Sequence, residues 1–219
     1  MKSLSPFILL MTAAVFCLVG QMKLEPLPIV LPKPLFEGTP VPPNVPNLEK
    51  PANRPRMPFL APAGVSNVAL RKLVTGSDSD PLPGNLDMVT DGDKRGTDGT
   101  FVQLKPGVQS IIIDLEGRHT IYAIAVWHYL KEPRAYASIV VDAADDPDFI
   151  SNVRTLFNND SINAAGLGIG KDMRYVETSE GKLIDAKGVE ARYVRLFSNG
   201  SDKAGTNHYV EVEVYGKPL

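Results

Sequence analysis

The sequence is poor in cysteine and carries no strong excess of charge. Its one cysteine, Cys17, lies within an apolar run near the N-terminus, so the rest of the 219-residue chain cannot form a disulfide. The formal net charge of -2 provides no basic field for nucleic acid, whose binding depends on clustered Lys and Arg. We therefore expect no nucleic-acid partner, and stability must come from an apolar core or a bound ion.

Familiar enzyme motifs are also missing. Neither a zinc-binding H-E-x-x-H helix nor a G-x-S-x-G nucleophile turn occurs in the sequence. The acidic stretch DAADDPDF, from Asp142, has a proline after an Asp pair and is typical of a solvated turn. The sequence therefore predicts a protein that is not an enzyme. A carboxylate pair facing across a cleft, as in glycoside hydrolysis, stays an alternative.

The N-terminus has the pattern of an export signal. In residues 1–20, Lys2 precedes an apolar run from Phe7 to Gly20 that is short for a membrane span. We expect a cleaved signal peptide or an uncleaved anchor, and hence an extracellular, periplasmic or cell-surface protein that touches membrane only through this segment. The simple signal fits a bacterial host, whereas Asn159 and Asn199 would be glycosylation acceptors in a eukaryotic one.

Residues 21–64 are rich in proline. Twelve of the 19 prolines fall between Lys23 and Pro62. Proline fixes φ and removes a backbone donor, so this density predicts an extended linker through which neither helix nor sheet can run. A Pro-rich recognition ligand is the alternative.

Residues 65–219 have the composition of a folded domain. Short apolar segments rich in Val, Ile and Tyr alternate with Gly, Asn and Asp turns, which predicts antiparallel sheets in a sandwich or jelly roll. The last segment, HYVEVEVYG from His208, alternates most clearly. Its pattern places Val210, Val212 and Val214 on one face, and Glu211, Glu213 and Tyr215 on the other.

The stretch MVTDGDKRGTDGT, residues 88–100, concentrates carboxylates and hydroxyls among glycines. An EF-hand loop counted from Asp91 would need an oxygen ligand at its fifth position and a glutamate at its twelfth. Those positions hold Arg95 and Val102, so this is not an EF-hand. A metal site here requires ligands from elsewhere in the chain, and otherwise the stretch is a surface turn.

The stretch WHYLKEPR, residues 127–134, places aromatic rings beside cationic donors at the end of an apolar strand. Aromatic faces stack on sugar rings, and charged donors bind sugar hydroxyls. We expect Trp127 to be a core residue, and His128, Tyr129, Lys131 and Arg134 to form a sugar-binding surface. The alternative is an ordinary solvated loop.

Five segments together identify a family resemblance. They are NVAL from Asn67, MVTDGD from Met88, SIIIDL from Ser110, ARYVRLFSNG from Ala191 and NHYVEVEVYG from Asn207. In this order they resemble the discoidin or coagulation-factor C-type domain, whose fold is shared with family 32 carbohydrate-binding modules and fucose-binding lectins. The resemblance implies an eight-stranded antiparallel jelly-roll β-sandwich over residues 65–219.

The resemblance also implies a calcium site that joins the two ends of the domain. Its ligands would be the Met88 carbonyl, the Asp91 carboxylate, the Asp93 carbonyl, the Thr97 hydroxyl, the Val210 carbonyl and the Glu211 carboxylate. Thr100 or Asp98 could take the place of Thr97. Mixed oxygen ligands suit calcium, and the expected role of the ion is structural.

The ligand site of the fucose-binding relatives uses one histidine and two arginines. Here the strand-end loop offers His128 and Arg134 where the two arginines would fall. Asn207 and His208, in the loop before the last strand, are further candidates to face the same pocket. One arginine is thus replaced by a histidine, which puts fucose specificity in doubt. The resemblance implies a monomeric, non-catalytic module that binds carbohydrate. A cell-surface or structural module that binds a protein partner stays the alternative.

Overall fold

The computed structural model describes residues 23–35, 41, 43–50, 52, 54–129, 131–132 and 134–219. The predicted signal or anchor, residues 1–20, lies outside this range. None of the helices formed by these residues has the length and apolar character needed to cross a membrane. The elements in chain order are β1 (Leu24–Pro26), β2 (Leu60–Pro62), β3 (Ser66–Asn67), β4 (Val74–Gly76), the 3-10 helix η1 (Leu86–Thr90), β5 (Val102–Leu104), β6 (Gln109–Trp127), β7 (Ala135–Tyr136), β8 (Val140–Ala144), β9 (Arg154–Asn158), β10 (Tyr175–Val176), β11 (Lys182–Ser198), β12 (Asn207–Tyr209) and β13 (Glu211–Pro218).

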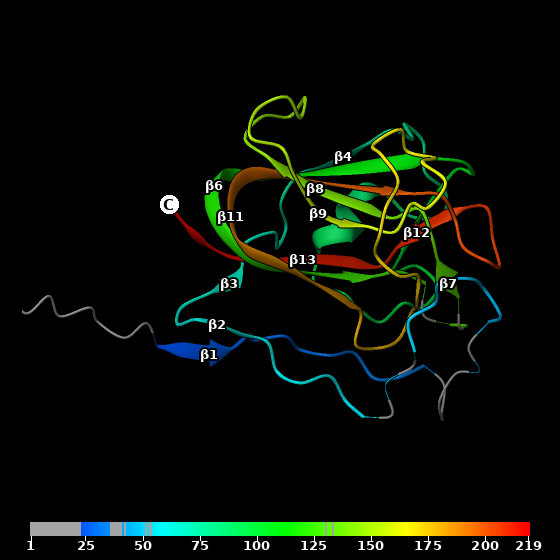
Figure 1. Ribbon diagram of the computed structural model, residues 1–219, viewed down its shortest axis with the longest axis horizontal. Helices are drawn as coiled ribbons and strands as arrows, with labels where there is room; N and C mark the ends of the chain where they lie inside the picture. The colour runs from blue at the N-terminus through cyan, green and yellow to red at the C-terminus, as the bar shows by residue number, and fades with distance from the viewer. Residues whose placement is uncertain are drawn as a thin grey trace, which may run out of the picture.

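Two long strands, β6 and β11, pair antiparallel over most of their length and bend together. The bend in β6 falls near Glu116, whose φ is 65°, and the bend in β11 falls at Lys187 and Gly188, whose φ values are 55° and 74°. The register between the two strands shifts twice, once between Asp185 and Val189 and once between Ala191 and Tyr193. Figure 1 shows both strands curving around the same edge of the molecule, so that one sheet folds over into two layers.

The two layers enclose the main core. One layer contains β4, the first half of β6, the second half of β11, β8 and β9, and the other contains β3, β13 and the remaining halves of β6 and β11. Ile111 and Ile113 from the first layer and Ile124 and Val214 from the second share one buried cluster. Burial of such a side chain is worth about 1.5–3 kcal/mol. The predicted all-β jelly-roll sandwich is confirmed.

The Pro-rich segment does not run free of the sandwich. Strands β1 and β2 pair with each other, and Leu27, Ala61 and Val65 pack in a second buried cluster on the outer face of the second layer. The expectation that no sheet runs through residues 21–64 is therefore wrong at these strands. Both strands end in a proline, where a missing N–H costs little. The division of the chain at residues 20 and 64 stays a prediction.

The outer cluster and the main core together bury both faces of β13. Glu211 and Glu213 point to the same side of the sheet as Tyr215. Their cross-strand partners on β6 are Trp127 and Ala125. Val210 also lies in the outer cluster, so the prediction that it shares a face with Val212 and Val214 is wrong. The reason is the break between β12 and β13, which falls at this residue.

The predicted core position of Trp127 is confirmed. Its side chain is fully buried in the outer cluster, and its Nε1 donates a hydrogen bond to the Ser179 carbonyl oxygen at 3.0 Å. Gly181, in the turn before β11, has a φ of 65° and lies against the indole. The turn between β10 and β11 is therefore fitted closely to this ring.

Candidate metal and binding sites

The loop after η1 meets the start of β13. Asn85 caps η1 by accepting a hydrogen bond from the Asp87 N–H, and Asp91 ends the helix. Gly92 follows with a φ of 90°, and its N–H donates to Glu211 Oε2 at 3.1 Å. The structure thus brings Asp91 close to Glu211, although 120 residues separate them in the chain.

Glu211 is a buried acid whose carboxyl group is only partly hydrogen-bonded by the described residues. Its side chain is fully buried, and its Oε1 has no hydrogen-bond partner among the described residues. Burial raises the pKa of this carboxyl to about 9. The hydrogen bond from the Gly92 N–H and the charge of Lys94 lower the pKa, whereas the charges of Glu213 and Asp91 raise it. A buried carboxylate with a free oxygen beside a second acid is a suitable place for a cation. The residues present therefore fit a calcium ion.

The neighbouring acid Glu213 differs because it is neutralised. Lys94 Nζ lies 2.5 Å from Glu213 Oε1, and both side chains are almost completely buried. The Tyr215 hydroxyl donates to Glu213 Oε2 at 2.6 Å. The ammonium of Lys94 also lies 5.0 Å from the centre of the Trp127 ring. Of these two acids, Glu211 is the one without a cation partner among the residues that the structure describes.

The other proposed calcium ligands occupy the same loop. Asp93 pairs with Arg95, which lowers the pKa of the Asp93 carboxyl, but the predicted ligand is the Asp93 carbonyl. The Thr100 hydroxyl donates to the Thr97 carbonyl, and Asp98 pairs with Lys131. Both alternatives to Thr97 are therefore engaged elsewhere. The described residues contain no group of three His, Cys, Asp or Glu side chains placed to hold a metal, so the set depends on backbone carbonyls from Met88, Asp93 and Val210.

Three predicted ligand residues gather near the start of β12. The guanidinium of Arg134 lies 4.2 Å from the centre of the Tyr129 ring. Its Nη1 lies 3.4 Å from His208 Nδ1, and His208 Nε2 lies 2.9 Å from Gln103 Oε1. The Tyr129 ring is packed edge-on against Phe101. Tyr129, Arg134 and His208 thus form one compact group, which we call the loop cluster.

Charged residues at the edge of the loop cluster are more exposed. Lys131 is exposed and pairs with Asp98, and Glu132 binds the Nε and Nη2 atoms of Arg134. Sequence reasoning missed Gln103 and Glu132 as neighbours of this cluster. Glu132 lies inside the WHYLKEPR stretch and could have been found as a partner of Arg134, whereas Gln103 is placed only by the pairing of β5 with β12.

Two predicted ligand residues have structural roles instead. His128 is fully buried, its Nδ1 lies 2.8 Å from the His208 carbonyl oxygen and its Nε2 lies 2.9 Å from the Tyr175 hydroxyl. Asn207 accepts a hydrogen bond from the Gly200 N–H and donates to the carbonyls of Lys105 and Gly107. Their prediction as ligand contacts is corrected, because every polar side-chain group of both residues is used inside the domain.

The predicted acidic turn from Asp142 is likewise built into the fold. Asp142 is buried on β8, where it accepts a hydrogen bond from Thr155 and pairs with Arg195. Asp146 accepts hydrogen bonds from the N–H groups of Ile150 and Ser151. Asp145 pairs with Arg118. These carboxylates hold strands and a turn together.

Comparisons with known proteins relate the chain only through its structure. No family model and no curated protein matches it. The family 89 glycoside hydrolase from Clostridium perfringens matches with a TM-score of 0.50 and 18% identity, over 70% of this chain and 15% of that one. The chain has a discoidin-type, galactose-binding-like fold.

Smaller solved structures also resemble this chain. One is a chitosan-binding module from the chitosanase/glucanase of Paenibacillus sp. IK-5, with a TM-score of 0.49 and 21% identity over 68% of this chain and 98% of that one. Another is a fucose-binding module of Streptococcus pneumoniae, with a TM-score of 0.49 and 21% identity over 68% and 97%. The chain spans only 15% of the length of the glycoside hydrolase.

Proposed function

We propose that this protein is a non-catalytic, exported carbohydrate-binding module with a structural calcium ion. The observation that carries this proposal is the loop cluster, in which an aromatic ring and a guanidinium lie beside a histidine at one place on the sandwich. The same fold occurs as a small part of a glycoside hydrolase, which supports a sugar as the ligand class. Fold alone does not establish function, so the proposal depends on the residues of the site.

The loop cluster has the chemistry that sugar recognition requires. Arg134 is held by Glu132 on one side and by His208 on the other, so its position is set before a ligand arrives. Lys131 lies at the exposed edge, where its ammonium can donate to hydroxyls. Tyr129 is partly buried and contributes an aromatic surface. In this proposal Lys131 and Arg134 bind sugar hydroxyls while Tyr129 supplies the apolar contact.

The calcium part of the proposal concerns stability. The ion would be held by the carboxylates of Asp91 and Glu211, the carbonyls of Met88, Asp93 and Val210, and the Thr97 hydroxyl. It would supply the positive charge that Glu211 lacks and would join the loop after η1 to β13. Because the chain has no second cysteine for a disulfide, such a joint between distant segments would add directly to the free energy of unfolding.

A protein partner is the second candidate function. Ile162 and Ile169, in the loop between β9 and β10, are 71% and 72% exposed. Exposed apolar side chains gathered in one loop are typical of protein contact surfaces. In either case we propose an exported, monomeric domain that meets membrane only through residues 1–20.

The test is glycan binding by the purified protein and by variants of the loop cluster. We expect a glycan array to identify a ligand, and Arg134→Gln or Tyr129→Ala to weaken its binding by about 10- to 100-fold, the effect of losing a charge-assisted hydrogen bond or a stacking contact. Arg118→Gln is the matched control, because Arg118 lies at the bend in β6 and pairs with Asp145. A silent array, or equal binding by all variants, would reject the loop cluster as a sugar site.

A further inference from the structure

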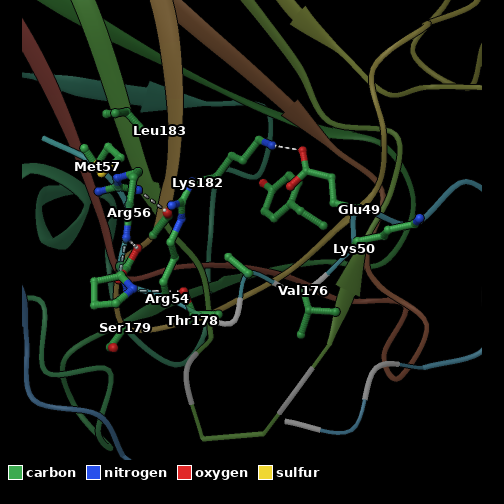
Figure 2. Close-up of a pocket in the computed structure, with 15 residues that line it drawn as sticks. Glu49, Lys50, Arg54, Arg56, Met57, Val176, Thr178, Ser179, Lys182 and Leu183 are labelled. Carbon is green, nitrogen blue, oxygen red and sulfur yellow. Dashed lines mark hydrogen bonds and ion pairs between the residues drawn. The ribbon is translucent and has the colours of Figure 1, made fainter. Parts of the chain in front are cut away.

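A pocket lies outside the loop cluster, between the Pro-rich segment and the turn that joins β10 to β11. Its volume is about 500 Å³, within the range of small-ligand sites. In Figure 2, Arg54, Arg56 and Lys182 lie on one side of the pocket, and Glu49 and Val176 lie on the other. The pocket therefore forms where the described residues of the Pro-rich segment, 49–50, 52 and 54–57, pass beside this turn.

The Pro-rich segment is fixed to the domain at both ends of the pocket. At one end, the Glu49 N–H donates to the Arg174 carbonyl at 2.8 Å, and the Arg174 N–H donates to the Asn47 carbonyl at 2.9 Å. At the other end, the Arg56 N–H binds the Glu180 carboxylate, and its Nη1 donates to the Gly181 carbonyl at 2.9 Å. These long-range hydrogen bonds make the pocket a built feature of the fold.

The pocket carries an excess of positive charge. Its lining includes four cationic residues, Lys50, Arg54, Arg56 and Lys182, but only the acids Glu49 and Glu180. Lys182 pairs with Glu49, and Glu180 is bound by the backbone of Arg56. Arg54 and Lys50 form no ion pair with any residue that the structure describes. Unpaired cations around a cavity favour an anionic ligand.

We propose that this pocket binds an acidic saccharide unit, a sugar that carries a carboxylate or a sulfate group. Arg54 contacts the anionic group, because its guanidinium can bind a carboxylate or sulfate through two parallel hydrogen bonds. The anionic character is inferred from the pocket itself, whereas the sugar scaffold rests on the proposed carbohydrate-binding function. The bound ligand bridges the Pro-rich segment and the β10–β11 turn.

The test is calorimetric titration of the full-length protein with D-galacturonate, galactose 6-sulfate and neutral galactose. The two anionic sugars separate a carboxylate ligand from a sulfate ligand. We expect at least one of them to bind, and Arg54→Gln to weaken that binding about tenfold or more, with partial recovery in Arg54→Lys. The matched control is Arg154→Gln, which removes an exposed arginine on β9 that does not line the pocket.

Several results would overturn the inference, and they differ from those that test the loop cluster. The inference fails if neither anionic sugar binds, if binding is unchanged in Arg54→Gln, or if neutral galactose binds to the Arg54 site equally well. Loss of galacturonate binding in Arg134→Gln but not in Arg54→Gln would move the ligand to the loop cluster, leaving the proposed function intact. Limited proteolysis adds a second readout, because a bridging ligand should slow cleavage between Glu49 and Met57.

Discussion

The Gly92 N–H donates a hydrogen bond to Glu211 Oε2 at 3.1 Å, and this contact joins the loop after η1 to the last strand of the sandwich. The other oxygen of Glu211 has no partner among the described residues. We expect calcium to raise the melting temperature, since a ligand at a hundredfold excess over its Kd adds about 2.7 kcal/mol. For a chain of this size that corresponds to a shift of several degrees.

Substitution of Glu211 should distinguish the effect of the ion on the melting temperature from the effect of the side chain itself. In chelator, Glu211→Gln should melt at or above the temperature of the unsubstituted protein, because it removes a carboxyl group whose ionised form is unfavourable when it is buried without a cation. In calcium it should melt below it, because a ligand is lost. Asp91→Asn should also lose the calcium response, whereas Asp145→Asn, an acid paired with Arg118, should keep it. Equal melting temperatures with calcium and chelator would exclude the site.

The docked Pro-rich segment leads to a second prediction. Leu27 is 9% exposed within the outer cluster, whereas Leu24, three residues earlier, is 54% exposed. Leu27→Ala should lower the free energy of unfolding by about 2 kcal/mol, the lower range for removal of a buried leucine side chain. Leu24→Ala should leave it nearly unchanged. Urea denaturation measures both values.

A chain that begins at residue 65 tests the same contact more severely. It should bind a dye for exposed apolar surface and unfold at lower urea, because the faces of Trp127 and Tyr215 in the outer cluster lose their cover. If residues 65–219 prove as stable as the longer chain, the segment is only a spacer.

The difference between expectation and structure at this segment has a physical cause. Local rules recognise proline as a breaker, and they predicted an unpaired linker. These local rules take no account of Ala123 and Ala125, whose side chains make the outer face of the sheet apolar. That face is buried by residues from outside the sandwich, such as Leu27. The period-two pattern of β6 and β13 predicted strands well, but it could not tell which polar positions would become buried.

The candidate sites show the same division between local and long-range information. The WHYLKEPR stretch correctly pointed to Tyr129 and Arg134 as neighbours, because they are close in sequence. His128 was misassigned, since its partner Tyr175 lies on β10, and no local pattern predicts that contact. The pocket beside Arg54 was not foreseen for a similar reason, because it forms where residues 49–50, 52 and 54–57 meet the β10–β11 turn.

The fit between Gly181 and Trp127 gives a third prediction. A Cβ added to Gly181 would lie 2.6 Å from Cε2 of the indole, and the backbone φ of 65° is itself unfavourable for alanine. Gly181→Ala should therefore lower the stability by more than 1 kcal/mol and shift the fluorescence of the single tryptophan to longer wavelength. Gly117→Ala is the control, because no atom lies within 4 Å of the Cβ it would gain. Unchanged fluorescence and stability in Gly181→Ala would contradict this fit.

The buried histidines predict a loss of stability in acid. Burial lowers the pKa of His128 to about 4, and burial together with the charge of Arg134 lowers the pKa of His208 to about 4. Their ordinary pKa is near 6.5, so between these values the unfolded chain binds more protons than the folded one. The contribution of the neutral rings is complete above pH 6.5 and is lost as the pH falls toward 4. Urea unfolding from pH 7 to pH 4 should show this decline, and NMR should show that neither ring titrates near pH 6.5.

Glu177 has the opposite effect on the pH dependence of stability. Its substitution should therefore reveal the contribution of the histidines alone. It accepts a hydrogen bond from the His128 N–H at 3.1 Å, and burial raises its pKa to about 8. Between pH 4.5 and 8 the folded protein holds a proton that the unfolded chain has released, so this group makes the protein less stable as the pH rises. Glu177→Gln keeps the acceptor oxygen but cannot ionise. The gain in stability of Glu177→Gln over the unsubstituted protein should therefore be larger at pH 8 than at pH 5. The loss of stability in acid that the histidines cause should remain in this variant. A pH-independent difference between the two proteins would show that Glu177 is ionised in the fold.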